Sequence, residues 1–575
     1  MNVISFREKA NFIWSVADLL RGDYKQAEYG KVILPLTVLR RLDSLLAKKK
    51  AKVLDAYPQF KKKSDVIVDK ALNKIAGYNF HNHSKYDFAK LAADPDGVAK
   101  NLRNYISGYS ASVREIFEHF NFEDQIERLD KADLLFLVIK RFSEIDLAAS
   151  DSMEMGYIFE ELIRKFAEIS NETAGEHFTP REVIKLIVNL LFINDGDGLS
   201  AKGAIRTLYD PTSGTGGMLS AGEAYINDLN PDGHLHVFGQ EINPESYAIC
   251  KADMLIKGQN PENIRGPKNT LSEDQFFGEH FDYMLSNPPF GVDWKKAEKV
   301  IKQEYESRGF AGRFGAGLPR INDGSFLFLQ HMISKMKPVK DGGSRIGIVL
   351  NGSPLFTGGA GSGESEIRKW IIENDMLEAI IALPDQLFYN TGISTYIWIV
   401  TNHKEKKRKA KVQLINAASF YQKMTKSLGN KRNEIPDAQI ERISKLYGDF
   451  KEGEFVKIYP NEFFGYSRIT VERPEKDENG KVVKDKHGKP KASSDLRDYE
   501  NVPLQDDITT YFKREVLPHV PDAWIDESKT KVGYEINFTK YFYKYKPLRS
   551  LEEIRKDILK LEKETEGLIS NIIEA

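Results

Sequence analysis

The chain has 575 residues, too many for one hydrophobic core, so its length predicts several domains. Apolar residues make up 41% and charged residues 29%, as in ordinary globular proteins, and the single cysteine, Cys250, excludes a disulfide framework or a cysteine zinc cluster. The 83 basic and 84 acidic residues give a net charge of −1. A protein that binds nucleic acid alone usually has an excess of basic residues, so if nucleic acid is the substrate we expect a partner to supply much of the binding. No apolar run is long enough to span a membrane, and the first residues carry charges where a signal peptide is apolar, so we expect a cytoplasmic protein with no membrane partner.

Residues 1–165 have the apolar spacing of α-helices. Between Val32 and Leu46 apolar residues recur every three or four positions, which is the period of one helical face. Residues 132–145, ADLLFLVIKRFSEI, repeat the pattern. We therefore predict an N-terminal α-helical bundle domain over residues 1–165.

Residues 166–472 alternate short apolar runs with helical patterns. The runs are IRTLYD (205–210), LHVFGQE (235–241), FDYMLSN (281–287), RIGIVLN (345–351), LEAIIALP (377–384) and TYIWIVTN (395–402). Strands separated by helices are typical of a largely parallel sheet with helices on both faces. The sequence thus predicts a Rossmann-like α/β domain over residues 166–472.

The C-terminal part begins with a charged stretch, residues 473–498, which carries two turn-like Gly-Lys sites. We interpret it as a variable insertion that forms either a solvated hairpin or a linker. Residues 499–575 form a last region that ends in a predicted helix. Its apolar heptad positions are Leu551, Ile558, Thr565 and Ile572 in one series and Ile554, Leu561 and Leu568 in the other. Such a helix either packs on its own domain or contacts a partner in the manner of a coiled coil.

The clearest candidate site begins at Asp210, where the first apolar run of this domain ends. A loop of small residues follows it, made of Thr212, Ser213, Gly214, Thr215, Gly216 and Gly217. A P-loop would need a lysine after the last glycine, and a dinucleotide fingerprint would need glycine where Leu219 stands, so neither nucleotide site is expected. A carboxylate before the loop can meet a cation such as a methionine ammonium, and Glu241, at the end of the next strand, can accept both hydroxyls of a ribose. The pair favours S-adenosylmethionine over simple packing of a glycine turn.

The second candidate site is the loop Asn287-Pro288-Pro289-Phe290. The two prolines end the preceding strand and make the loop rigid. The Asn287 side chain and the Pro288 carbonyl offer acceptors for an exocyclic amine, and Phe290 offers a flat face for stacking a base. A base inside a duplex is out of reach, so the nucleotide must be flipped out. A proline-terminated strand with a core phenylalanine is the plain alternative, but the two acids upstream favour the catalytic interpretation.

Three other features have structural explanations. Thr179 to Glu182 form a good helix start, which could also close over the methionine end of the cofactor. The basic run from His403 to Lys411 lies between two predicted strands and is interpreted as an exposed turn and not a DNA clamp. Cys250 lies on a helical pattern and is expected in the core. The histidines lack metal-ligand spacing, so no metal is inferred.

The order of three motifs, FTP at 178–180, DPTSGTGGML at 210–219 and NPPF at 287–290, resembles amino-type DNA methyltransferases. More specifically, the chain resembles the modification subunit of Type I restriction-modification systems. The N-terminal LLRGDYKQAEYGKVILPLTVLRRLD and the C-terminal VGYEINFTKYFYKYKPLRSLEEIRKDI also look like this family. The resemblance covers nearly the whole chain apart from about 474–495.

The resemblance implies a site-specific adenine-N6 DNA methyltransferase that uses S-adenosylmethionine. The residues it places at the cofactor are Glu176, His177, Phe178, Thr179, Pro180, Arg181, Asp210, Ser213, Gly214, Thr215, Gly216, Gly217 and Glu241. Asn287, Pro288, Pro289 and Phe290 would hold the flipped adenine. Where the family carries an acid for the adenine ring of the cofactor, this chain has Asn269, and that contact stays open. The implied partners are DNA, a specificity subunit that binds two modification subunits, and a restriction subunit that can join them.

Three alternatives to adenine methylation remain at the level of sequence. Cytosine-N4 methyltransferases use a similar loop, usually with serine or aspartate at the position of Asn287. Protein glutamine methyltransferases carry an Asn-Pro-Pro-aromatic loop, but they are much shorter. A vestigial methyltransferase fold could serve as an assembly subunit, although intact Asp210, Glu241 and Asn287 argue against it. Cytosine-C5 chemistry needs a nucleophilic cysteine that this loop lacks.

Overall fold

The structure is a computed structural model. It describes residues 6–573 apart from 151–153, 156–157, 160, 163–164, 167–178, 194–198, 200, 202, 258, 390, 429 and 544–548. By its contacts the chain divides into two compact units, Met1–Ile536 and Asn537–Ala575. Within the described ranges, no helix combines the length and the apolar character needed to cross a membrane.

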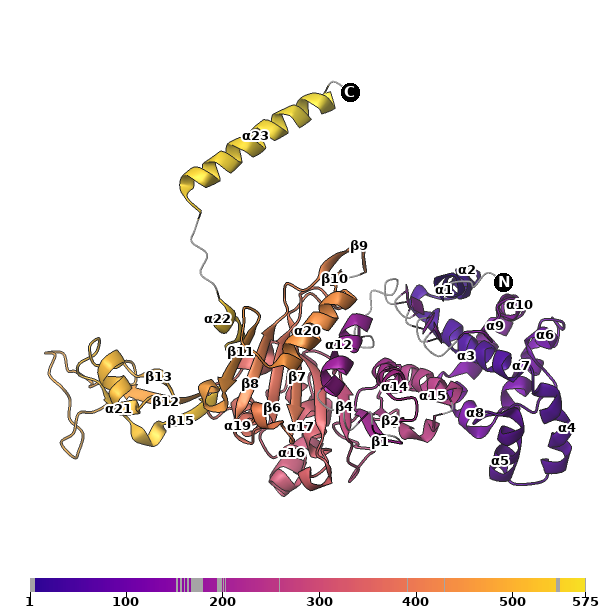
Figure 1. Cartoon of the computed structure of the whole chain (residues 1–575), viewed down its shortest axis with the longest axis horizontal. Coiled ribbons are helices and arrows are strands. Elements are labelled where there is room, and N and C mark those ends of the chain that lie inside the picture. Colours follow the sequence, from indigo (N-terminus) through magenta and orange to yellow (C-terminus); the bar gives the residue numbers. More distant parts are fainter. Residues whose placement is uncertain are drawn as a thin grey trace. The chain divides into compact units, whose positions relative to one another are not determined.

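The N-terminal part of the first unit is the predicted helical bundle (Figure 1). Its helices are α1 (Phe6–Trp14), α2 (Val16–Leu20), α3 (Gly30–Leu46), α4 (Lys50–Phe60), α5 (Asp65–Ala76), α6 (Phe88–Leu91), α7 (Val98–Ser107), α8 (Ala111–His119), α9 (Phe122–Lys131) and α10 (Leu135–Ser143). The long helix α3 runs through Pro35, and its apolar face, Val32, Leu36, Leu39, Leu42 and Leu46, is buried as the spacing predicts. The bundle contacts the sheet domain through α8, where Glu115 pairs with buried Lys251 at 2.7 Å.

The centre of the first unit is a nine-stranded sheet in the order β11-β8-β6-β7-β5-β4-β1-β2-β3. Its strands are β1 (Ile205–Asp210), β2 (His234–Gln240), β3 (Ile264–Arg265), β4 (Tyr283–Ser286), β5 (Arg345–Asn351), β6 (Leu377–Ala382), β7 (Thr395–Thr401), β8 (Lys411–Asn416) and β11 (Val456–Pro460). All six predicted strands are present. The sheet is largely parallel, but β7 and β11 run antiparallel to their neighbours, so it is mixed.

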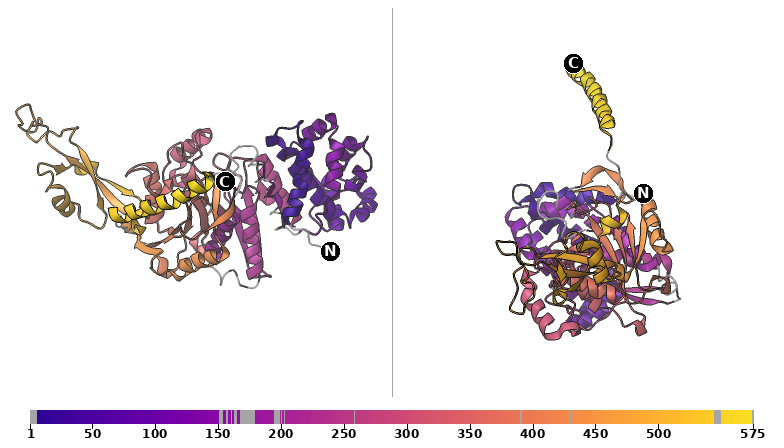
Figure 2. Two further views of the ribbon diagram at one scale, coloured as in Figure 1. Left: turned by 90° about the horizontal axis from the view of Figure 1, so that it is seen from above. Right: turned by 90° about the vertical axis from the view of Figure 1, so that its left-hand side faces the viewer.

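Helices cover both faces of this sheet, as Figure 2 shows. One face carries α12 (Arg181–Phe192), α14 (Gly217–Leu229), α15 (Pro244–Ile256) and α20 (Asp437–Asp449), and the other carries α17 (Ser325–Ser334). Successive side chains of a strand point to opposite faces, so on β1 Leu208 lies against α14 while Tyr209 stacks on Phe281 with ring centroids 4.5 Å apart. Both are fully buried because the sheet is covered twice.

A smaller sheet of β12 (Gly465–Glu472), β13 (Asp498–Pro503), β14 (Trp524–Ile525) and β15 (Lys531–Tyr534) follows the main one. The charged stretch 473–498 prolongs the β12–β13 hairpin. It holds isolated antiparallel bridges between Pro474 and Ala492 and between Lys484 and Pro490. The stretch is therefore paired with itself along part of its length.

The second unit contains α22 (Phe538–Phe542) and the 23-residue helix α23 (Leu551–Ile573). The helix covers the predicted heptad region. Its heptad residues Leu551, Ile554, Ile558 and Leu561 are exposed. The side chains of the remaining heptad positions, Thr565, Leu568 and Ile572, lie outside the described residues.

Candidate functional site

The predicted site residues come together because three strands end at one edge of the sheet. Strand β1 lies between β2 and β4 and is parallel to both. The residues at or just after their carboxyl ends are Asp210, Glu241 and Asn287. Ligands of open α/β sheets bind at this edge. Three positions that are far apart in the sequence thus share one site.

Asp210 is buried at this edge, with 2% of its surface exposed. Its Oδ1 accepts a hydrogen bond from the backbone N–H of Thr212 at 2.9 Å. Burial, helped by the nearby charge of Glu241, raises the pKa of the carboxyl to about 7. Among the described residues no basic side chain pairs with Asp210, so a positively charged ligand group would find an uncompensated carboxylate here.

The loop after Asp210 is held to the end of β2. The Ser213 N–H donates to the Gln240 carbonyl at 3.0 Å, and the Gly214 N–H donates to Glu241 Oε2 at 2.7 Å. Gly216 has φ +87°, and a Cβ there would lie 2.9 Å from the sulfur of Cys250, so only glycine fits this turn. Thr215 lies inside the turn, and Gly217 is the first residue of α14. The buried Cys250 is thus a core residue, as expected, and it shapes the loop.

Glu241 is buried and its two carboxylate oxygens have separate partners. Oε2 accepts from Gly214 N, and Oε1 accepts from the Asn243 N–H at 2.8 Å. Each carboxylate oxygen has a second lone pair, so both can still accept a hydroxyl. The predicted contact with a ribose therefore remains chemically open.

Asn287 is the first residue of the predicted catalytic loop, residues 287–290, directly after β4. Its Nδ2 donates to Thr179 Oγ1 at 2.9 Å, which fixes the amide and turns its oxygen the other way. The oxygen Oδ1 is buried and has no hydrogen-bond partner among the residues that the structure describes. Buried acceptors are nearly always paired, because an unpaired one costs about 1–3 kcal/mol. Within the described part of the chain, this acceptor is therefore available to a ligand donor. One residue earlier, Ser286 Oγ lies 2.8 Å from Thr212 Oγ1 and joins this loop to the one after Asp210.

Phe290 is half-buried, and its ring meets Phe388 edge to face with centroids 5.4 Å apart. Pro288 is buried and Pro289 half-buried before it. Sequence reasoning missed Phe388, although it follows the predicted strand 377–384, whose carboxyl end lies at the same edge. The rule that loops at this edge form the site would have found it.

A cavity of about 40 Å³ lies between Asp210 and Asn287. Its lining residues are Thr179, Ile184, Asp210, Thr212, Ser213, Gly214, Thr215, Gly217, Met218 and Asn287. Thr179 is thus part of the site, while Pro180 and Arg181 begin α12 beside it. Three other predicted residues, Glu176, His177 and Phe178, lie outside the described residues.

The loop with Asn269 follows β3 and is held from two sides. Asn269 Oδ1 accepts from the Leu271 N–H at 2.9 Å, and Thr270 Oγ1 donates to the Pro211 carbonyl at 2.6 Å. Arg313 donates to the carbonyls of Thr270 and Leu271, both at 2.9 Å. Arg313 comes from the segment between β4 and β5, and no sequence signal marked it. The Asn269 loop is thus tied both to the turn after Asp210 and to the segment after the catalytic loop.

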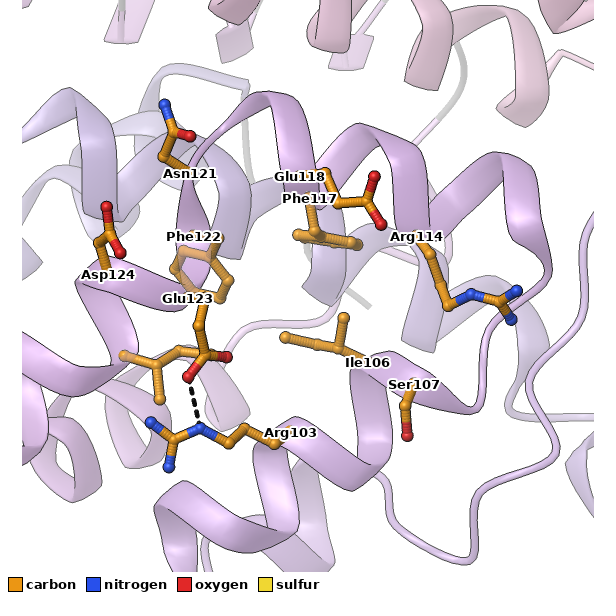
Figure 3. A pocket seen from close by; sticks show the side chains of 11 residues that line it. Arg103, Ile106, Ser107, Arg114, Phe117, Glu118, Asn121, Phe122, Glu123 and Asp124 are labelled. Carbon is orange, nitrogen blue, oxygen red and sulfur yellow. Dashed lines mark hydrogen bonds and ion pairs between the residues drawn. The ribbon is translucent and has the colours of Figure 1, made fainter.

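A larger cavity of about 520 Å³ lies in the helical bundle between α7, α8 and α9 (Figure 3). Its lining residues are Arg103, Ile106, Ser107, Arg114, Phe117, Glu118, Asn121, Phe122, Glu123, Asp124 and Ile126. The Arg103 and Glu123 side chains pair across its rim at 2.6 Å. None of the predicted site residues lines it, and we assign it no chemistry. Over the described ranges no group of three or more His, Cys, Asp or Glu side chains could hold a metal ion.

The chain is similar to known families and proteins. The family described as N-6 DNA Methylase matches residues 150–472, and the HsdM N-terminal domain matches residues 9–142. The chain is 26% identical over 466 residues to the methylase subunit of the Type I restriction enzyme MjaIX from Methanocaldococcus jannaschii, with 78% of each chain covered. It is 30% identical over 275 residues to the HindI methylase subunit from Haemophilus influenzae, which covers 48% of this chain and 56% of that one.

Two solved structures share the fold. The type I restriction-modification methyltransferase subunit from Streptococcus thermophilus aligns with a TM-score of 0.64 at 24% identity, covering 80% of this chain and 97% of that one. A chain from a structure of type I R-M complex assembly and conformational transition aligns with a TM-score of 0.52 at 20% identity, covering 99% and 98%.

Proposed function

Because the chain belongs to the N-6 DNA methylase family, we propose that it methylates N6 of a flipped adenine in DNA, as the modification subunit of a Type I restriction-modification complex. The family membership confirms the resemblance drawn from the three motifs. The observation that carries the proposal is the buried Oδ1 of Asn287, which has no partner among the described residues and lies beside the Asp210 pocket.

The pocket residues fit S-adenosylmethionine. The cofactor would supply a methyl group on a positively charged sulfur, next to a methionine ammonium. Asp210, a buried carboxyl without a basic partner, suits a cationic group, and the turn Ser213 to Gly217 allows close approach to the backbone. Glu241 retains lone pairs for the ribose hydroxyls. Asp210 and the turn Ser213 to Gly217 line the small cavity, except for Gly216, and would hold the methionine part of such a ligand.

Asn287 performs the orienting step. Its Oδ1 accepts one N–H of the adenine amino group, and the Pro288 carbonyl accepts the other. The amino nitrogen is thereby held with its lone pair directed towards the cofactor side of the pocket. S-adenosylmethionine, when bound, would supply the methyl group for this nitrogen as its sulfur–methyl bond breaks, and the amino group would release one proton to water. Thr179 fixes the Asn287 amide so that its oxygen, and not its nitrogen, faces the base.

Phe290 and Phe388 supply the aromatic wall. The edge-to-face pair leaves the half-buried Phe290 ring rigid. Stacking on such a ring contributes about 1–3 kcal/mol per base, which offsets part of the cost of unstacking the nucleotide from its duplex.

The partners follow from charge and from the exposed helix. A net charge of −1 gives weak overall attraction to DNA, which is consistent with recognition by a specificity subunit. The exposed apolar residues of α23 offer that subunit a helical contact. We propose two modification subunits per specificity subunit, with a restriction subunit as an additional component.

The choice of adenine over cytosine rests on Asn287 and on the family. The experiment is to co-express the chain with its specificity subunit and to analyse the DNA by mass spectrometry. N6-methyladenine at a defined site is expected. Detection of N4-methylcytosine would contradict the choice of adenine as the target base. Unmethylated DNA together with methylated glutamine in a protein would contradict the choice of DNA as the substrate.

A further inference from the structure

The antiparallel hairpin of β9 (Gln422–Leu428) and β10 (Lys431–Glu434) projects beyond the main sheet (Figure 1). It follows β8, which is parallel to β6, so it emerges at the carboxyl edge of the sheet. The same edge carries Asp210 and Asn287. The hairpin plays no part in the mechanism above.

A buried lysine fastens this hairpin to one wall of the catalytic pocket. Lys431 is 3% exposed and pairs with Glu182 in the first turn of α12. Its ammonium also donates to the carbonyls of Leu387 and Asn433, both at 3.0 Å. Burying an ammonium is costly unless it is paired and hydrogen-bonded, so this anchor is specific. Glu182 lies three residues after Thr179, which holds Asn287.

Backbone bonds fasten the hairpin to a second wall, the segment around Phe388. The Asn430 N–H donates to the Tyr389 carbonyl at 2.9 Å, and the Arg432 N–H donates to the Gln386 carbonyl at 3.0 Å. These two acceptors flank Phe388, the ring that packs against Phe290. The hairpin thus joins both walls of the pocket that would receive the base.

The outer surface of the hairpin is basic. Residues 422–434 contain four basic residues and one acid, Glu434, in a chain with a net charge of −1. Lys431 is neutralised inside, but Lys423 and Arg432 are exposed and make no ion pair in the part of the chain that the structure describes. The Glu434 carboxylate accepts from Gln422 at 2.7 Å. Two uncompensated cations therefore stand at the rim of the catalytic edge.

We propose that the β9–β10 hairpin binds the phosphate backbone of the DNA strand whose base enters the pocket, through Lys423 and Arg432. The inference rests on the proposed function, since it takes DNA as the substrate. Phosphates on either side of an extruded nucleotide must lie near the pocket mouth, and phosphate contacts from Lys and Arg fix the position of a protein on DNA without reading its sequence. Because Lys431 bonds to both pocket walls, it would hold the phosphate-binding hairpin in a fixed position relative to them.

The test neutralises both residues, Lys423→Gln with Arg432→Gln, in the complex with the specificity subunit. The matched control is Lys406→Gln with Lys409→Gln, two exposed lysines in the turn after β7. Because β7 is antiparallel to β5, that turn lies at the opposite edge of the sheet. Each lost phosphate contact lowers the slope of log affinity against log salt by about 0.9, so the hairpin variant is expected to lose about 1.8. In the hairpin variant, KM for DNA is expected to rise while KM for S-adenosylmethionine stays at the wild-type value. In the control variant, both KM values and the salt slope are expected to stay at wild-type values.

An unchanged salt slope and KM for DNA in the hairpin variant would overturn the inference. Loss of assembly with the specificity subunit, with a normal slope in the complexes that do form, would also overturn it and indicate a protein-binding hairpin. If the wild-type complex does not methylate adenine, the proposed function fails, and that result is separate from either outcome.

A second measurement does not depend on activity. Cys250 is fully buried and its thiol pKa is raised by burial, so Lys423→Cys provides one reactive thiol for a photo-crosslinker. Cross-links to the strand that carries the target adenine are expected from position 423 and not from Lys406→Cys. Equal labelling of both positions, or labelling of protein alone, would contradict the proposal.

Discussion

Acidification is expected to weaken the binding of S-adenosylmethionine, because Asp210 must be ionised to meet a cation. The carboxyl has a pKa of about 7, so about three quarters of the chains carry the charge at pH 7.5 and about 3% carry it at pH 5.5. Apparent affinity scales with the fraction of protein that is competent to bind, which gives a loss of about 25-fold over this interval. Isothermal titration at several pH values measures it directly.

The substitution Asp210→Asn separates this carboxyl from other titrating groups, including those of the ligand. Asparagine keeps the acceptor for the Thr212 N–H but cannot ionise, so we expect weak binding with little dependence on pH between 5.5 and 7.5. Losing a charge-assisted contact costs about 1.5–3 kcal/mol, or roughly 10- to 150-fold in affinity at pH 7.5. A variant that binds as tightly as the wild type, or wild-type binding that is flat across this interval, would refute the reasoning.

The same substitution has the opposite effect on stability. The pKa of Asp210 is raised in the folded chain from 3.8 to about 7, so the folded state holds its proton more tightly and stability falls as pH rises between these values. At pH 8 the ionised, unpaired carboxylate costs up to about 4 kcal/mol. The ligand-free Asp210→Asn variant should therefore unfold at a higher temperature than the wild type while binding the cofactor less tightly. A merely damaged fold would lower both.

Three further predictions concern the scaffold of the site. Glu241→Ala removes the acceptor of the Gly214 N–H, so S-adenosylmethionine binding is expected to fall at least tenfold, since a hydrogen bond to a charged group contributes about 1.5–3 kcal/mol; equal affinity by titration would contradict the role of this acid. Gly216→Ala places a Cβ at φ +87° and 2.9 Å from a sulfur, whereas Gly278→Ala has a similar φ of +76° and open space, so the first is expected to lose more thermal stability than the second. Glu378→Gln breaks the buried ion pair between Glu378 and Arg345, whose charged atoms lie 2.9 Å apart and in which the pKa of Glu378 is lowered to about 2. Breaking a buried pair costs about 3–5 kcal/mol, so chemical denaturation should show a loss of stability of this size. A loss below about 1 kcal/mol would mean that the pair is not needed for stability.

The fold was largely predictable because apolar periodicity carries most of it. All six strand predictions correspond to strands of the main sheet, and the helical N-terminal region forms a bundle. The direction of β7 was not predictable, because no residue type encodes whether a strand runs parallel or antiparallel to neighbours that lie far away in the chain. The charged stretch 473–498 could not be resolved into hairpin or linker, since solvated segments of either kind have the same composition.

The site was predictable where an edge of the sheet defines it. Asp210, Glu241 and Asn287 each follow a recognisable strand, so their convergence follows from the parallel order of β2, β1 and β4. Lys431 and Arg313 were not predictable, because the partners of each include backbone carbonyls more than 40 residues away. Backbone carbonyls are present at every position and leave no trace in the sequence.

The central claim is that the Oδ1 oxygen of Asn287 holds the amino group that is methylated. It is tested most directly by the rate of labelled methyl transfer to DNA in a single turnover, comparing the wild-type complex with Asn287→Ala. Our account predicts a loss of at least about 100-fold, as when a preorganised hydrogen-bonding group is removed from an active site, with S-adenosylmethionine binding and assembly unchanged. Transfer to N6 of adenine at the wild-type rate in this variant would contradict it.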